Sequence, residues 1–169
     1  MIGVAGAGKS YLVREMRRRG FKAVDVDDGL ATFVDDYGEE VEYNPKGGAR
    51  WWATHHYVLK VGALEKLLKE NDPVYLFGDV GGQPGKANGL LDVTHLFDRT
   101  CYLKAPKELI RKRLKAREDN PFGKNPEEVE GTMKHKKKLD DVARRRGLKV
   151  VDATLPTDEV IKVIVGVRR

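Results

Sequence analysis

The first ten residues contain the pattern in this chain that is best suited to chemistry. Gly3 to Ser10 read GVAGAGKS and fit the phosphate-loop pattern G-x-x-x-x-G-K-[ST] at every fixed position. In such a loop the glycines let backbone N–H groups wrap phosphates, the lysine reaches terminal phosphate oxygens, and the following hydroxyl ligates Mg²⁺. The predicted nucleotide-binding residues here are Gly3, Ala5, Gly6, Ala7, Gly8, Lys9, Ser10 and Tyr11.

Acidic residues follow two of the apolar runs, at the ends where parallel strands would bring them near bound phosphates. Asp25 and Asp27 close KAVDVDD, and Asp79 closes PVYLFGD. Residues two apart on a strand point the same way, so we expect Asp25 and Asp27 on one side. Such carboxylates can hold a metal-bound water and accept a proton from an attacking hydroxyl. We predict that Ser10, Asp25 and Asp79 ligate Mg²⁺ and that Asp27, or else Asp25, is the base; capping and solvation are the alternative for these acids.

The elements that must position these residues follow from hydrophobic periodicity. Short apolar runs predict strands at 22–28, 73–79, 99–103 and 148–152. Helical spacing predicts helices at 9–19, 61–70, 107–117, 126–146 and 157–167. This alternation is typical of a parallel sheet with helices on both faces. Residues 32–43 interrupt it and read as a hairpin or an irregular excursion, whereas 117–126, REDNPFGKNP, reads as a loop.

Composition narrows the class of protein. A length of 169 residues with 40% hydrophobic content suits one domain, 1–169. The net charge of +6 suits a polyanionic ligand such as a nucleotide and would also suit nucleic acid, which we do not favour. The single cysteine, Cys101, cannot form an internal disulfide, and no apolar run approaches the ~18 residues of a membrane span. We expect a cytoplasmic protein without membrane association, and the sequence does not predict its oligomeric state.

These motifs, in this order, resemble those of the small P-loop kinases. The likeness rests on the glycine loop, on DVDD after the second strand, on FGD closing a central strand, on two arginines before NPFGK, and on VDAT near the end. The Asp-x-Asp is most similar to shikimate and gluconate kinases, whereas size and plan also match adenylate kinase and other nucleoside monophosphate kinases. The resemblance implies an α/β three-layer sandwich whose parallel five-stranded sheet has the order 2-3-1-4-5, with a shortened first strand.

The resemblance also implies roles for residues late in the chain. Arg113 would flank the adenine, and the turn that contains Thr154 would touch the base edge. Arg117 would enter the site when a lid loop, about 117–126, closes on the phosphates, with Lys124 as a second lid cation. An exposed helix face is the ordinary alternative for the two arginines, and the basic run 134–138 is expected to be a solvated face.

Acceptor selection is expected to depend on an excursion at about 28–60 and on the loop after Asp79. The hairpin carries the acids Asp35, Asp36, Glu39, Glu40 and Glu42. These charges disfavour a phosphorylated acceptor and favour a neutral or cationic hydroxyl compound. An aromatic and histidine cluster, expected on a helix, comprises Trp51, Trp52, His55, His56 and Tyr57. Core packing is its ordinary explanation and stacking of a planar acceptor is the alternative, while Gln83, Lys86 and Asn88 could supply hydrogen bonds to that acceptor.

The predicted function is ATP- and Mg²⁺-dependent transfer of the terminal phosphoryl group to a hydroxyl of a small molecule. A nucleoside monophosphate kinase, a polynucleotide 5′-hydroxyl kinase and a nucleotide-binding regulator without transfer activity are the alternatives. The sequence names neither the acceptor nor the choice between ATP and GTP. Only Met1 and Ile2 precede the loop, whereas a central strand needs about five residues, so we expect a natural start upstream of Met1 or a loop anchored by a stub.

Overall fold

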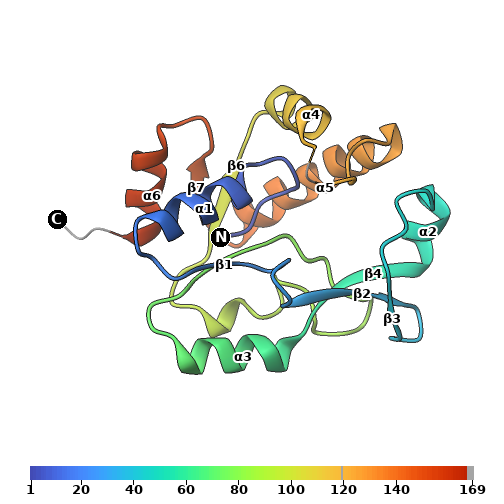
Figure 1. The fold of residues 1–169 in the computed structure, drawn as a ribbon, viewed down its shortest axis with the longest axis horizontal. Coiled ribbons are helices and arrows are strands. Elements are labelled where there is room, and N and C mark those ends of the chain that lie inside the picture. The colour runs from blue at the N-terminus through green and yellow to red at the C-terminus, as the bar shows by residue number, and fades with distance from the viewer. Residues whose placement is uncertain (119, 167–169) are drawn as a thin grey trace.

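A computed structural model describes residues 1–118 and 120–166 (Figure 1). The helices are α1 Lys9–Arg18, α2 Gly48–Thr54, α3 Val61–Glu70, α4 Lys107–Ala116, α5 Pro126–Arg145 and α6 Thr157–Val165, with a 3₁₀ helix at Thr94–Leu96. The strands are β1 Ala23–Asp25, β2 Ala31–Asp35, β3 Glu40–Val41, β4 His55–Leu59, β5 Tyr75–Phe77, β6 Cys101–Lys104 and β7 Lys149–Asp152. The last residues of the helix predicted at 157–167 lie outside the described part of the chain.

The parallel strands form two pairs, with the first residues of the chain between them. β1 pairs with β5, and β6 pairs with β7, both in parallel. Ile2 makes parallel bridges to Gly78, which follows β5, and to Tyr102 of β6. The Ile2 N–H donates to the Cys101 carbonyl at 2.8 Å, and the Ile2 carbonyl accepts the Leu103 N–H at 2.8 Å. The predicted α/β class with parallel pairing is confirmed, but the strands are short and are assigned to separate sheets instead of one five-stranded sheet.

Helices cover these strands with fully buried side chains. Met16 of α1, Leu64 of α3, Ile110 and Leu114 of α4, and Phe77 of β5 are all 0% exposed. Burial of such a side chain typically contributes about 1.5–3 kcal/mol. In Figure 1, α1 and α3 lie on opposite sides of β1. None of the helices in the described residues is long and apolar enough to cross a membrane.

A second, antiparallel sheet follows β1 in the chain, and Figure 1 shows it with α2 on the side of the molecule away from α6. Its strand order is β3-β2-β4, and Phe33 lies between Val41 of β3 and Tyr57 of β4. The predicted hairpin is therefore present. The helix expected to hold both histidines is wrong, because α2 ends at Thr54 and His55 begins β4. Pairing with β2 along all of β4 outweighs the local pattern.

The basic run 134–138 differs from expectation at one residue. The Lys136 side chain is only 5% exposed, and its Nζ donates to Asp140 Oδ2 at 2.7 Å. The Tyr102 hydroxyl donates to the other oxygen of that carboxylate at 2.8 Å. Lys136 is therefore part of the packing of α5 against β6 and does not belong to a solvated face.

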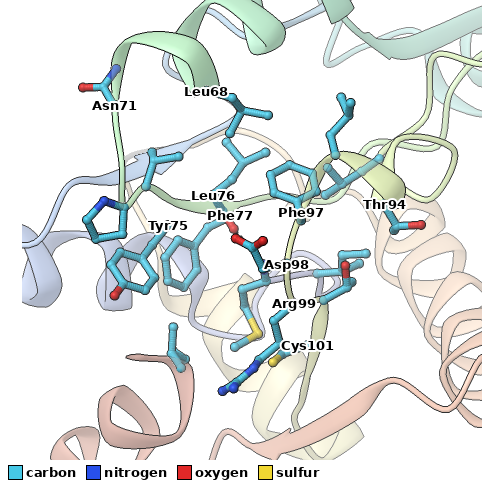
Figure 2. Close-up of a pocket in the computed structure, with 18 of the residues that line it drawn as sticks. Leu68, Asn71, Tyr75, Leu76, Phe77, Thr94, Phe97, Asp98, Arg99 and Cys101 are labelled. Carbon is cyan, nitrogen blue, oxygen red and sulfur yellow. The ribbon is translucent and has the colours of Figure 1, made fainter. Parts of the chain in front are cut away.

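A cavity of about 610 Å³ lies at the amino-terminal ends of β5 and β6 (Figure 2). Tyr75 and Phe77 line it from β5, and it is also lined by Cys101, the first residue of β6, and by Arg99, which precedes β6. Parallel α/β sheets bind their ligands at the carboxyl ends of the strands, where the glycine loop lies here. This cavity is therefore at the other end of the strands from the candidate site.

Candidate functional site

The glycine loop has the backbone conformation that its glycines permit. Gly6 has a φ of 78° and Gly8 a φ of 111°, in the left-handed region that side chains with a Cβ rarely adopt. Gly8 is also the N-cap of α1. A Cβ on Gly8 would lie 3.1 Å from Arg113 Nη1, so space as well as conformation restricts this position. The loop thus leads into the N-terminus of α1, whose dipole favours a bound anion.

Lys9 and Ser10 extend from the end of this loop. The Lys9 ammonium donates to the Gly3 carbonyl at 2.6 Å and to the Val4 carbonyl at 3.1 Å, so it lies over the loop. The Ser10 hydroxyl donates to Asp25 Oδ2 at 3.0 Å. The contact between Ser10 and Asp25 brings the end of β1 against the start of α1, as the sequence predicts for a shared site.

Asp25 is a buried carboxylate beside this hydroxyl. Asp25 is 7% exposed. Burial raises the pKa of Asp25 above its usual range, and the nearby charge of Asp27 raises it further. The hydrogen bond from Ser10 and the ammonium of Lys9 oppose the increase in pKa. A cation bound at this carboxylate would relieve the cost of keeping it ionised.

Asp27 is exposed and has a different partner. The Tyr57 hydroxyl of β4 donates to Asp27 Oδ1 at 2.6 Å. Burial, and then this hydrogen bond, raise the pKa of Tyr57, so the phenol remains a donor. Strand periodicity does not explain the position of Asp27, because β1 ends at Asp25 and residues 26–30 form a turn. The third acid, Asp28, forms an ion pair with Arg17 at 2.5 Å.

Asp79 lies against α5 in this structure. Its Oδ1 is 2.8 Å from Nε2 of His135. This hydrogen bond raises the pKa of His135 against the lowering effect of burial. The structure therefore joins Asp79 to His135, and it is Asp25 that Ser10 contacts. No local signal in the sequence links two residues that are 56 positions apart.

A cavity of about 300 Å³ adjoins the glycine loop and α1. Five predicted nucleotide-binding residues are among those that line it: Ala7, Gly8, Tyr11, Arg113 and Thr154. Arg113 Nη1 donates to the Ala7 carbonyl at 2.7 Å, which fixes α4 against the loop. The volume is at the lower end of the range for ligand pockets and suits a nucleobase better than a whole nucleotide.

The two predicted lid cations, Arg117 and Lys124, bond to carbonyl groups of the lid loop and of the end of α4. Arg117 Nε donates to the Phe122 carbonyl at 3.0 Å, and its guanidinium lies 5.7 Å from the centre of the Phe122 ring. Lys124 Nζ donates to the Lys115 carbonyl at 2.9 Å and also to the Arg117 carbonyl. Entry of Arg117 into a phosphate site remains a prediction.

The aromatic residues near the hairpin pack against one another. Phe33 lies at the centre, with ring centroids 4.6 Å from Tyr57 and 5.3 Å from Tyr43. We call Phe33, Tyr43, Trp51, Trp52 and Tyr57 the aromatic cluster. The sequence did not predict that Phe33 and Tyr43 belong to it, although period-two alternation around 33 was a usable signal. Through its hydroxyl, Tyr57 connects this cluster to Asp27.

The two histidines of this region, His55 and His56, lie in β4 and not on a helix. His55 stacks on Trp51, with ring centroids 4.5 Å apart and planes 6° apart. His56 Nε2 is 2.9 Å from Asp36 Oδ1 at the hairpin turn. Packing on α2 accounts for His55, and pairing with the hairpin turn accounts for His56.

The glycine-rich loop after Asp79 supports the hairpin. Gln83 Nε2 donates to the carbonyls of Asp35 and Asp36 at 3.3 and 3.1 Å. The Leu59 N–H of β4 donates to the Asn88 carbonyl at 2.8 Å. Gln83 is thus bonded to the backbone of the hairpin, and Asn88 is bonded to β4 and, through its Oδ1, to the Gln83 N–H. Lys86, the third predicted acceptor-binding residue of this loop, is exposed.

Replacing Arg113 with methionine tests the small cavity. We expect about tenfold weaker binding of ATP, because the variant loses a charged hydrogen bond to the loop and one wall of the cavity. Binding of inorganic tripolyphosphate, which has no base, should weaken less. Isothermal titration calorimetry with both ligands measures the difference. Equal weakening of the two ligands would show that Arg113 serves the phosphates and not the base.

Two solved structures of deoxyadenosine kinase from M. mycoides resemble this chain. The structure with bound dATP covers 98% of this chain and 96% of its own, with 17% identity and a TM-score of 0.49. The structure with bound dCTP covers 98% of this chain and 95% of its own, with 17% identity and a TM-score of 0.47. No protein-family model and no curated protein matches the sequence.

Proposed function

We propose that this chain is an ATP- and Mg²⁺-dependent kinase that phosphorylates a hydroxyl group of a small molecule. The observation that carries the proposal is the hydrogen bond of 3.0 Å between Ser10 and Asp25. A glycine loop by itself indicates only phosphate binding. The bond to Asp25 adds an acidic group at the edge of the loop, where a phosphoryl-transfer site needs a metal ligand and a base.

The nucleotide would bind with its phosphates on the glycine loop and its base in the small cavity. Lys9 lies over the loop and can move its ammonium to phosphate oxygens. Tyr11, Arg113 and Thr154 surround the space for the base. Arg117 would approach the phosphates when the lid loop changes position, and the lid would exclude water from the reaction.

Ser10 and Asp25 are the protein ligands that we propose for Mg²⁺. Hydroxyl and carboxylate oxygens suit this ion, which usually takes one or two carboxylates together with substrate phosphates and waters. Among the described residues no group of three or more His, Cys, Asp or Glu side chains could hold a metal ion. Bound Mg²⁺ would neutralise charge on the phosphates. We leave Asp79 out of this ligand set because its side chain bonds to His135 of α5, whereas the hydroxyl of Ser10 contacts Asp25.

Asp27 is the proposed base for the acceptor hydroxyl. Asp27 is exposed, lies two residues after the end of β1, and accepts a hydrogen bond from the Tyr57 hydroxyl at 2.6 Å. The acceptor would lie between Asp27 and the aromatic cluster, under the acidic hairpin. That charge favours a neutral or cationic acceptor, and Arg50 is the one arginine in residues 28–60. A nucleoside monophosphate would need more positive charge than this region offers.

The proposal also includes the sheet order 2-3-1-4-5. These numbers count the five parallel segments along the chain, which are Ile2, β1, β5, β6 and β7, so the proposed spatial order is β1, β5, Ile2, β6 and β7. The Ile2 bridges to Gly78 and to Tyr102 support it, because they put the first residues between the β1-β5 pair and the β6-β7 pair. In this order the glycine loop follows the central position of the sheet, where α/β proteins commonly bind phosphates.

A transfer assay with labelled ATP tests the function. The terminal phosphoryl group of ATP is labelled, and Mg²⁺ is added with a panel of nucleosides, sugar acids, amino alcohols, AMP and an oligonucleotide with a 5′-hydroxyl. We expect labelled product from a neutral or cationic small molecule. Product from AMP alone would favour a nucleoside monophosphate kinase, and product from the oligonucleotide alone a polynucleotide kinase. Nucleotide binding without product from any acceptor would favour a regulator.

A further inference from the structure

Glu128 is a buried carboxylate between two parts of the proposed site. It lies in the first turn of α5 and is 6% exposed. Its Oε2 accepts the Gly123 N–H of the lid loop at 2.7 Å. Its Oε1 accepts the hydroxyl of Tyr43, which belongs to the aromatic cluster. One side chain therefore bonds both the lid loop and the region proposed for the acceptor.

Two further contacts join the same regions. Trp52 of α2 packs edge-on against Phe122 of the lid loop, with ring centroids 5.8 Å apart and an angle of 83°. The Ala49 N–H of α2 donates to Glu127 Oε2 at 3.0 Å. The lid loop and the aromatic cluster are thus in contact through a ring pair as well as through α5.

The lid loop also contacts the helix that borders the small cavity. Gly123 has a φ of 88°, and a Cβ on it would lie 2.8 Å from Leu114 Cδ2 of α4. The residue before Leu114, Arg113 of α4, lines the small cavity and bonds to the glycine loop. A chain of contacts therefore runs from the small cavity through α4, Gly123 and Glu128 to Tyr43.

We propose that Glu128 is a positioning residue that couples the nucleotide site to the acceptor region. The inference rests on the proposed function, since it requires a nucleotide at the glycine loop. A nucleotide that shifts the lid loop would pull on Gly123 and, through Glu128, on Tyr43 and the packing of Trp52. Bound nucleotide would then change the affinity for an acceptor at the aromatic cluster. Thermodynamic linkage requires that the bound acceptor changes the affinity for nucleotide by the same factor.

A carboxylate suits this role because, when ionised, it has no donor and acts only as a hydrogen-bond acceptor. A buried carboxylate is costly unless donors satisfy it, so loss of either partner favours rearrangement of the other. A merely structural role for Glu128 would affect stability, but it would not transmit nucleotide binding to α2. The test must therefore follow a signal from α2 at constant nucleotide occupancy.

Tryptophan emission supplies that signal, because the two tryptophans of the chain, Trp51 and Trp52, both lie in α2. The protein is titrated with Mg-ATP while emission is recorded, and binding is measured separately by calorimetry. The test variant is Tyr43→Phe, which removes the hydroxyl and keeps the ring that stacks on Phe33. Tyr37→Phe is the matched control, because Tyr37 is 93% exposed near the hairpin turn.

We expect Mg-ATP to change tryptophan emission in the wild type and in Tyr37→Phe. In Tyr43→Phe the change at saturation should fall by about half or more, although calorimetry still shows binding. Equal emission changes in wild type and Tyr43→Phe would overturn the coupling role of Glu128. Binding without any emission change in the wild type would overturn it as well and leave the proposed kinase function intact. Absence of Mg-ATP binding by calorimetry would overturn both proposals.

Discussion

Replacing Lys9 with alanine should abolish the stabilisation of this protein by Mg-ATP. A ligand at about 100 times its dissociation constant adds about 2.7 kcal/mol to the free energy of unfolding. Without the ammonium that lies over the loop, the terminal phosphates would lose the protein cation proposed to contact them, and this gain should nearly vanish. Thermal unfolding with and without Mg-ATP measures the gain for each protein.

The matched control for this experiment is Lys66→Ala. The Lys66 side chain is 76% exposed on α3. Lys66→Ala therefore removes the same charge as Lys9→Ala, but at a position away from the glycine loop. We expect the control to retain the full stabilisation. The comparison uses the increase caused by ligand in each protein, since Lys9 also bonds the Gly3 carbonyl and its loss can alter the stability of the free protein. An undiminished increase in Lys9→Ala would contradict the phosphate site.

Replacing Asp27 with asparagine should lower the phosphoryl-transfer rate by about 10²–10⁴-fold, the usual contribution of a general base. The amide keeps an oxygen for the Tyr57 hydroxyl, so the local structure should persist. Binding of Mg-ATP should be nearly unchanged, because Ser10 and Asp25 make the contacts proposed for the metal. Single-turnover rates with the acceptor from the transfer assay, together with calorimetry, separate the two effects.

Asp28→Asn removes a neighbouring charge without removing the proposed base. Asp28 forms an ion pair with Arg17, with both side chains 48% exposed. We expect this control to keep most of the transfer rate. A normal rate in Asp27→Asn would exclude Asp27 as the base. In that case loss of transfer in Asp25→Asn, at Mg²⁺ concentrations that restore nucleotide binding, would assign the role to Asp25.

Local signals in the sequence predicted a large part of the fold. The helix predicted at 61–70 has the bounds of α3, and Asn125 and Pro126 begin α5 as an N-cap and first helical residue. The glycine loop was predictable for the same reason, since each of its requirements falls within Gly3–Ser10. The contact between Ser10 and Asp25 followed from the expected meeting of a strand end and the loop.

Contacts between distant segments could not be predicted in this way. Tyr57 and Asp27 are 30 positions apart, and neither pattern around them indicates the other. β4 begins at His55, directly after the last residue of α2, Thr54. No glycine or proline separates the two elements, so the sequence has no local signal for the change from helix to strand. Glu128 is one of three acids in the start of α5, and only the fold shows which of them is buried.

The position of Ile2 has a consequence for cooperativity. The residues that begin the glycine loop also connect the two parallel strand pairs, through bonds from Ile2 and Gly3 to Cys101 and Gly78. The loop therefore cannot fray at its start while the sheet stays whole. The amide hydrogens of Ile2 and Gly3 should exchange with solvent by global unfolding and not by local opening. We therefore expect the start of the glycine loop and the parallel strands to unfold together.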